Sequence, residues 1–153
     1  MSTKQQPGTN NDAVLATLTE VLRSTSVDLA TAHDGAPWAS NAFFVQDDNF
    51  RLRLVLESGG TTLRHLRANP RIGLKIVPSG LLQPFAQGVG TVEVLDPAEL
   101  DPTFDAVVAK APDLAPFRGA PIDPIAVTVE WWRVTHVEQG WLPGRVVHRE
   151  QLA

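Results

Sequence analysis

The chain has 153 residues, a formal net charge of −4 and no cysteine. This length suits one domain with a sizeable core, and the lack of cysteine excludes disulfides, thiolate metal sites and cysteine nucleophiles. The 13 basic residues form no block, which argues against a nucleic-acid partner or an anionic membrane surface. No apolar run reaches the length of a membrane span and no signal-peptide region is visible, so we expect a cytoplasmic protein.

The N-terminal part divides into a tail and a helix. The polar residues 1–12 are expected to form a flexible tail, and residues 13–153 a single domain. Apolar residues recur at helical spacing over residues 13–24, which predicts a first helix. Asn11 or Asp12 is the expected cap of that helix.

Three strands follow in close succession. Residues 26–32 and 38–46 are rich in strand-forming types and flank a turn at Asp34–Gly35. Residues 50–57 alternate between apolar and mostly polar side chains, which predicts a third strand with one buried face. Because the turns between them are short, these strands are expected to form an antiparallel meander.

A short helix is predicted after the segment Ser58–Thr62, and Asn69–Pro70 ends it before a strand over residues 72–77. Its start combines free backbone N–H groups with several hydroxyl groups, a combination that suits an anion such as phosphate. The alternative is that Thr61 or Ser58 merely caps the helix, and the local sequence alone favours that alternative.

The remaining chain continues the β pattern. We predict a strand over residues 81–95 with a bulge at Gly88 or Gly90, followed by a helix from Asp96 to about Lys110. A proline-rich loop is predicted over 111–124. A long strand over 125–137 and a short strand or tail over 141–153 complete the chain. The sum is a mainly β fold with a few short helices, most simply a six-stranded antiparallel split β-barrel.

Four phrases, in this order, resemble those of the FMN-binding split-barrel superfamily related to pyridoxamine 5′-phosphate oxidase: Leu29–Ala32, Asp34–Pro37, Leu66–Leu74 and Gln87–Leu95. The resemblance implies a homodimer with FMN bound in grooves at the subunit interface. It also implies that the phosphate lies near the strand–turn–helix segment of residues 50–77. The implied activity is that of an FMN-dependent oxidoreductase acting on an unknown small molecule.

The candidate cofactor-binding residues combine positions that match the superfamily pattern, polar neighbours of the helix start and one tryptophan able to stack on a flavin. They are Ser40, Asn41, Glu57, Ser58, Thr61, Thr62, Arg64, Gln83, Gln87 and Trp141. Two departures from the superfamily pattern argue against pyridoxamine phosphate oxidase activity itself. Ser40 and Val45 stand where an arginine and a lysine are usual, and Gly60–Thr62 replaces a Ser-Arg-Lys phosphate clamp.

Other polar and aromatic residues have simpler interpretations. Arg53 and Lys75 fall on the polar faces of their strands, where exposure to solvent is expected. Trp131, Trp132 and Trp141 are able to stack on a flavin, but core or interface packing is the favoured interpretation.

The four histidines show no metal-ligand spacing. Scattered surface positions are the favoured interpretation for all four, and His65, on the short helix, is the one candidate for haem binding or proton transfer. Two alternatives to an FMN enzyme therefore stay open at this point: a deazaflavin-dependent reductase, and a cofactor-free or haem-binding module of the same fold.

Overall fold

The computed structural model describes residues 7–80 and 82–152. Its seven strands are β1 (Ser26–His33), β2 (Ala36–Asp48), β3 (Arg51–Glu57), β4 (Arg71–Ile76), β5 (Phe85–Val94), β6 (Ile122–His136) and β7 (Trp141–His148). Its α-helices are α1 (Pro7–Val21), α2 (Thr61–Ala68) and α3 (Leu100–Lys110), and short 3-10 turns are η1 (Pro97–Glu99), η2 (Pro112–Phe117), η3 (Val137–Gln139) and η4 (Arg149–Leu152).

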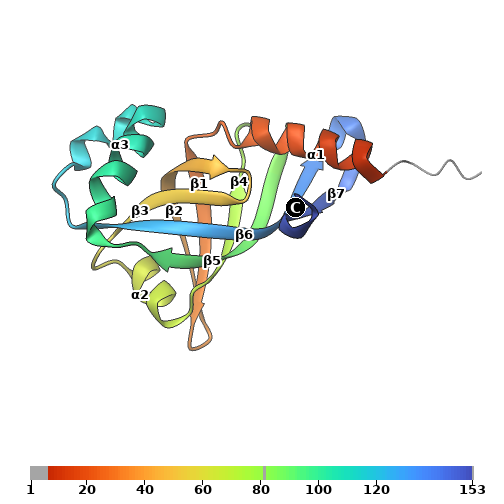
Figure 1. The fold of residues 1–153 in the computed structure, drawn as a ribbon. Coiled ribbons are helices and arrows are strands. Elements are labelled where there is room, and N and C mark those ends of the chain that lie inside the picture. Colours follow the sequence, from red (N-terminus) through yellow and green to blue (C-terminus); the bar gives the residue numbers. More distant parts are fainter. Residues whose placement is uncertain (1–6, 81, 153) are drawn as a thin grey trace, which may run out of the picture.

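Six of the strands close into a ring. The sheet runs β3-β2-β1-β4-β5-β6-β7, with every paired neighbour antiparallel, and β3 also pairs with β6. This extra pairing closes β1 to β6 into the predicted six-stranded barrel, and β7 extends the sheet beyond β6 (Figure 1). The predicted fold class is therefore confirmed. The segment predicted as a short strand or tail supplies a seventh strand, β7.

Alternation along the strands decides which side chains fill the barrel. On β3, Leu52, Leu54 and Leu56 are buried in the main core, as the period of two predicts. Val55 points to the other face and joins a second, smaller apolar cluster with Phe104 of α3. The outside of β3 is thus covered by α3 instead of by solvent.

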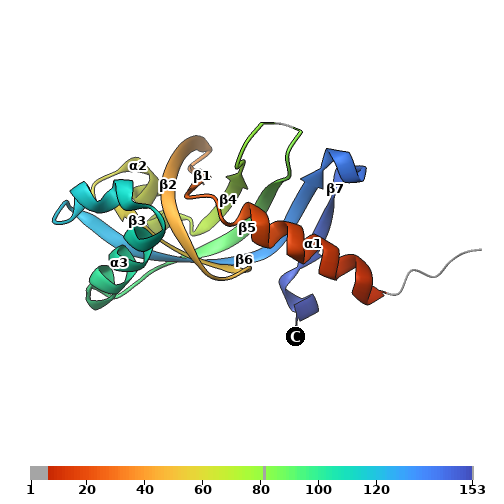
Figure 2. The same cartoon turned by 90° about the horizontal axis from the view of Figure 1, so that it is seen from above.

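The helices lie at opposite ends of the barrel. Both views place α2 and α3 at one end, and α1 with β7 at the other (Figures 1 and 2). Leu18 and Leu22, at and just beyond the C-terminal half of α1, are fully buried against the barrel core. Among the described residues, no helix has the length and apolar character needed to cross a membrane.

Several boundaries differ from the sequence prediction. Helix α1 begins at Pro7, so residues 7–12 are helical instead of part of a tail, and neither Asn11 nor Asp12 is its cap; residues 1–6 lie outside the described residues. Strand β6 begins at Ile122, inside the predicted loop, because Ser58 N–H bonds to the carbonyl of Pro121 and β3 pairs with the next residues.

The predicted bulge in β5 is confirmed. The register of β5 against β6 shifts between Val89 and Gly90. A Cβ on Gly90 would lie 2.5 Å from the carbonyl oxygen of Thr128, so glycine is the residue type that permits this close approach of two backbones.

Candidate functional site

A cavity of about 370 Å³ opens beside the start of α2, and we call it the α2 pocket. Strands β2, β3 and β6, helix α2 and the turn η2 all contribute to its wall. The lining side chains are Trp38, Ser40, Asn41, Ala42, Phe43, Val55, Leu56, Glu57, Gly60, Thr61, Thr62, Leu114, Phe117 and Ile122.

Half of the candidate cofactor-binding residues meet in this pocket. They are Ser40, Asn41, Glu57, Thr61 and Thr62, which come from two strands and the helix start. The structure therefore brings together residues separated by up to 22 positions in the sequence. Ser58 and Arg64 adjoin the pocket in the β3–α2 turn and the first turn of α2, but both are exposed and neither lines it.

The start of α2 is not capped by a side chain. Gly60 is the N-cap residue and no side-chain bond caps the helix, so the capping alternative for Thr61 and Ser58 is wrong. The first helical bond runs from Arg64 N–H to the Gly60 carbonyl at 3.2 Å. The N–H groups of Thr61, Thr62 and Leu63 consequently have no partner within the helix, which leaves them directed at the N-terminal end.

A chain of hydroxyl groups connects α2 to β2. Trp38 Nε1 donates to Thr62 Oγ1 at 3.1 Å, and Thr62 Oγ1 donates to Ser40 Oγ at 2.8 Å. Because Ser40 accepts in this chain, its own hydroxyl hydrogen remains to be donated elsewhere. The pocket thus presents Ser40 as a hydrogen-bond donor whose position is fixed by two other side chains.

The charge of the pocket is negative. Glu57 is the one charged residue among the lining residues. The nearest candidate cation is Arg64, whose Nη2 lies 3.5 Å from Thr61 Oγ1 at the rim.

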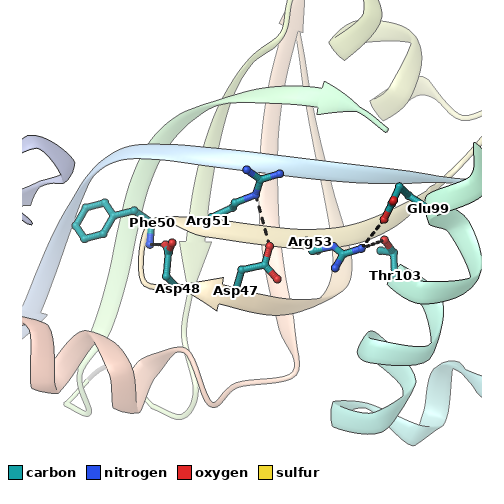
Figure 3. Close-up of polar contacts among 7 residues, drawn as sticks. All are labelled: Asp47, Asp48, Phe50, Arg51, Arg53, Glu99 and Thr103. Carbon is teal, nitrogen blue, oxygen red and sulfur yellow. Dashed lines mark hydrogen bonds and ion pairs between the residues drawn. The ribbon is translucent and has the colours of Figure 1, made fainter. Parts of the chain in front are cut away.

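Arg53 is engaged with helix α3, on the face of β3 that also carries Val55. Its Nη2 donates to Thr103 Oγ1 at 2.7 Å and lies 3.3 Å from Glu99 Oε2, and its side chain is 21% exposed (Figure 3). The expectation of a solvated Arg53 is therefore wrong: this arginine ties β3 to the start of α3 and is not available to a ligand in the α2 pocket.

A second cavity, of about 450 Å³, lies on the outer face of β1, β4, β5 and β6, and we call it the outer-face pocket. Gln87 lines it, together with Lys75 and Arg133. Arg133 Nη2 lies 3.4 Å from Gln87 Oε1, and Lys75 Nζ lies 5.4 Å from the ring centre of Phe85. Gln83 is exposed in the turn before β5 and lines neither pocket.

The tryptophans divide between core and surface. Trp132 is fully buried, and Trp141 is 6% exposed, with its ring 5.7 Å from that of His136. Trp141 therefore packs in the core and lines neither the α2 pocket nor the outer-face pocket. Trp131 lines the outer-face pocket.

His65 is buried beneath β1, so the expected surface position is wrong for this histidine. Its Nδ1 lies 3.1 Å from Thr31 Oγ1, and the residue is 6% exposed and lines neither pocket. Within residues 7–80 and 82–152, no group of three His, Cys, Asp or Glu side chains is placed to hold a metal ion.

Sequence reasoning missed the apolar half of the α2 pocket. Trp38 is 46% exposed and Phe117 is 54% exposed, and both line the cavity with Leu114. The sequence carried no signal for this, because the proline-rich segment that holds Leu114 and Phe117 is distant in the chain and its path over β3 depends on tertiary packing.

Comparison with known proteins agrees with this architecture. A family model described as pyridoxamine 5′-phosphate oxidase matches residues 13–136. No curated protein matches the chain.

Solved structures with the same fold include a protein related to general stress protein 26 from Clostridium acetobutylicum (18% identity, TM-score 0.73, 93% of this chain and 99% of that chain). They also include an FAD-binding protein from Mesorhizobium loti (22%, 0.59, 76% and 90%). A haem-binding protein from Mycobacterium smegmatis matches at 18% identity and a TM-score of 0.68 over 80% of this chain, which spans about half (53%) of that protein. At these identities the neighbours establish the fold alone. The family model covers most of the chain, and the protein therefore belongs to the pyridoxamine 5′-phosphate oxidase family.

Proposed function

We propose that the protein binds FMN at the α2 pocket and acts as an oxidoreductase on a small molecule. The observation that carries this proposal is the convergence of Ser40, Asn41, Thr61 and Thr62 on one cavity at the β3–α2 turn. A cavity of about 370 Å³ is within the usual size range of small-molecule sites, roughly 300 to 1,000 Å³. Membership of the family and the FAD-binding neighbour add support for a flavin.

The hydrogen-bond donors at the start of α2 are of the types that bind phosphate. The N–H groups of Thr61, Thr62 and Leu63, the Thr61 hydroxyl and the guanidinium of Arg64 are the groups that would hold it. Ser40 would donate a hydrogen bond to a ring acceptor, and Phe43 and Phe117 supply apolar contact. Bound flavin supplies the redox chemistry, while these residues bind and orient it.

We also propose that the protein works as a homodimer joined through the outer face of the sheet. One row of paired positions crosses five strands with a mixture of charges: Asn41, Asp28, Lys75, Gln87 and Arg133. Because the row carries both signs, a second copy related by a two-fold axis is able to place unlike charges opposite each other.

The adjoining row is largely apolar, with Ala39, Ala30, Gly73, Val89 and Trp131 at paired positions. Small residues let another sheet face approach closely. Asn41 of the α2 pocket donates to Asp28 of the outer-face pocket at 2.9 Å, so the two pockets adjoin. A second copy on the outer face would thus help to enclose a ligand in the α2 pocket.

The other candidate functions have less support from this chain. His65, the histidine that the sequence singles out for haem, is enclosed between α2 and β1 and lines neither pocket. A deazaflavin with a longer anionic tail would need a basic groove, and the one charged lining residue of the α2 pocket is acidic.

The test is a titration of the purified protein with FMN, followed by flavin absorbance and fluorescence. We expect saturable binding of one FMN per protomer. Arg64→Ala and Thr61→Ala are each expected to weaken it by about three- to tenfold, because a hydrogen bond to a charged group contributes about 1 kcal/mol or more at a partly exposed site. Arg23→Ala is the matched control, because this arginine is 73% exposed, pairs with Glu20 and does not line the pocket. Unchanged affinity in both variants would reject the phosphate assignment, and no binding by the wild-type protein would reject the proposed function.

A further inference from the structure

The carboxylate of Glu57 lies against the N-terminal end of α2. The backbone turns tightly here, since Gly60 N–H bonds to the Glu57 carbonyl at 3.1 Å. A Cβ built on Gly60, the N-cap residue, would lie 3.3 Å from Glu57 Oε2. The side chain of Glu57 is therefore folded back over the first residues of the helix.

The arginines around Glu57 are directed to other partners. Arg64 bonds to Thr61, Arg67 pairs with Asp123 at 3.6 Å, and Arg53 is bound to α3. No ion pair to Glu57 is found in the part of the chain that the structure describes. Its negative charge is thus not neutralised by a neighbouring side chain.

The start of a helix favours an anion, and here the Glu57 carboxylate already places one negative charge beside it. A phosphate monoester brings roughly two further negative charges near neutral pH. Placed on the N–H groups of Thr61 and Thr62, it would compete with the Glu57 carboxylate for the same positive end of α2 and would be repelled by it. An uncharged flavin tail meets no such competition.

We propose that Glu57 is a specificity-determining residue that weakens the hold of the α2 pocket on phosphorylated ligands, so that FMN is an exchangeable ligand and not a permanently bound group. This inference rests on the proposed function, because it assumes that a flavin enters the α2 pocket. It assigns to Glu57 a role opposite to that of a cofactor-holding residue.

The experiment compares two ligands that differ only in the phosphate, FMN and riboflavin, on the wild-type protein and on Glu57→Gln. The amide keeps the size and hydrogen-bonding capacity of the side chain and removes its charge. We expect Glu57→Gln to tighten FMN binding by about five- to tenfold, the usual scale of a partly screened charge interaction with a dianion. Riboflavin affinity is expected to change by less than about twofold. Glu138→Gln, an exposed carboxylate in η3 that does not line the pocket, is the control and should leave both affinities unchanged.

The outcomes separate this inference from the proposed function. Wild-type binding of FMN with unchanged or weaker FMN affinity in Glu57→Gln would overturn the role of Glu57 and leave the flavin site standing. Equal tightening of FMN and riboflavin would also overturn it, because the effect would not depend on the phosphate. Absence of binding of either flavin to either protein would overturn the flavin site itself, and the role of Glu57 with it. Equal thermal unfolding temperatures of the two proteins would exclude misfolding as the cause.

Discussion

Lys110, at the C-terminal end of α3, joins three parts of the fold through one ammonium group. Its Nζ donates to the Leu22 carbonyl at 2.7 Å and to Gln46 Oε1 at 2.8 Å, and it lies 3.6 Å from the ring centre of Phe44. Burial of the ammonium lowers the pKa of Lys110 from 10.5 to about 8.

This shift predicts a rise in stability at alkaline pH. Between about pH 8 and 10.5 the unfolded chain keeps the Lys110 proton that the folded chain has lost, so the free energy of unfolding increases with pH across this window. We expect an increase of about 1 kcal/mol, because solvent screening at a half-buried site reduces the effect well below the full shift. Urea unfolding at a series of pH values measures it; no tyrosine or cysteine titrates in this window, and comparison with a Lys110 variant separates Lys110 from the other amines.

Lys110→Met is the matched variant, since it keeps the unbranched apolar stem and removes the titrating group. Its free energy of unfolding should be flat across the same pH window. A slope equal to that of the wild-type protein would show that another group titrates there and that the environment of Lys110 is not the cause.

At the scale of single elements, the bulge between β5 and β6 is a point where one added carbon has a large effect. A Cβ on Gly90 would meet the Thr128 carbonyl oxygen at 2.5 Å and the Val129 Cα at 3.1 Å, and both are backbone atoms in the centre of the sheet. Gly90→Ala is therefore expected to lower the free energy of unfolding by about 2 to 3 kcal/mol. Thermal or urea unfolding measures the loss.

Gly80→Ala provides the control for this prediction. A Cβ at Gly80, in the β4–β5 turn, would have no heavy atom within 4 Å beyond its two neighbours in the chain. This variant should unfold within about 0.5 kcal/mol of the wild-type protein. Equal, small effects of both substitutions would mean that the two backbones separate easily at the bulge.

An element of the fold was predictable where the residues that determine it lie close together in the sequence. The alternation of Leu52, Leu54 and Leu56 is a local pattern, and β3 and its buried face were predicted from it. The bulge was also predictable, because glycines inside a strand pattern have a local steric meaning. By contrast, nothing near Arg53 in the sequence indicates that α3 packs over it, so the pairing with Thr103, fifty residues away, was missed.

The candidate site was likewise predictable only in part. The polar residues around the β3–α2 turn are close in sequence, and the resemblance to the family placed Ser40 and Asn41 with them. Trp141 and Gln83 were misplaced, because burial between β6 and β7 and exposure in a turn are results of tertiary packing. Leu114 and Phe117 were missed for that reason too.

At the scale of the whole molecule, the proposed dimer joins two copies through the outer face of β2, β1, β4, β5 and β6. Ala39, an exposed residue in the small-residue row on that face, is the position where a bulky charge would interfere most directly with a facing sheet. Ala39→Arg is expected to convert a dimer into a monomer in light scattering and to weaken FMN binding at the adjoining pocket.

Ala98→Arg introduces the same change at an exposed position of η1, away from the outer face, and should leave both the dimer and FMN affinity unaltered. A wild-type protein that is monomeric at micromolar concentration would reject the dimer, and a dimer insensitive to Ala39→Arg would place the interface on another face.

The most direct test of the central claim is a crystal structure of the protein grown with saturating FMN. We predict flavin density in the α2 pocket, with the phosphate at Thr61 and Thr62 and a second protomer lying across the outer face. Flavin density at another place, or a pocket that stays empty at saturating FMN, would contradict it.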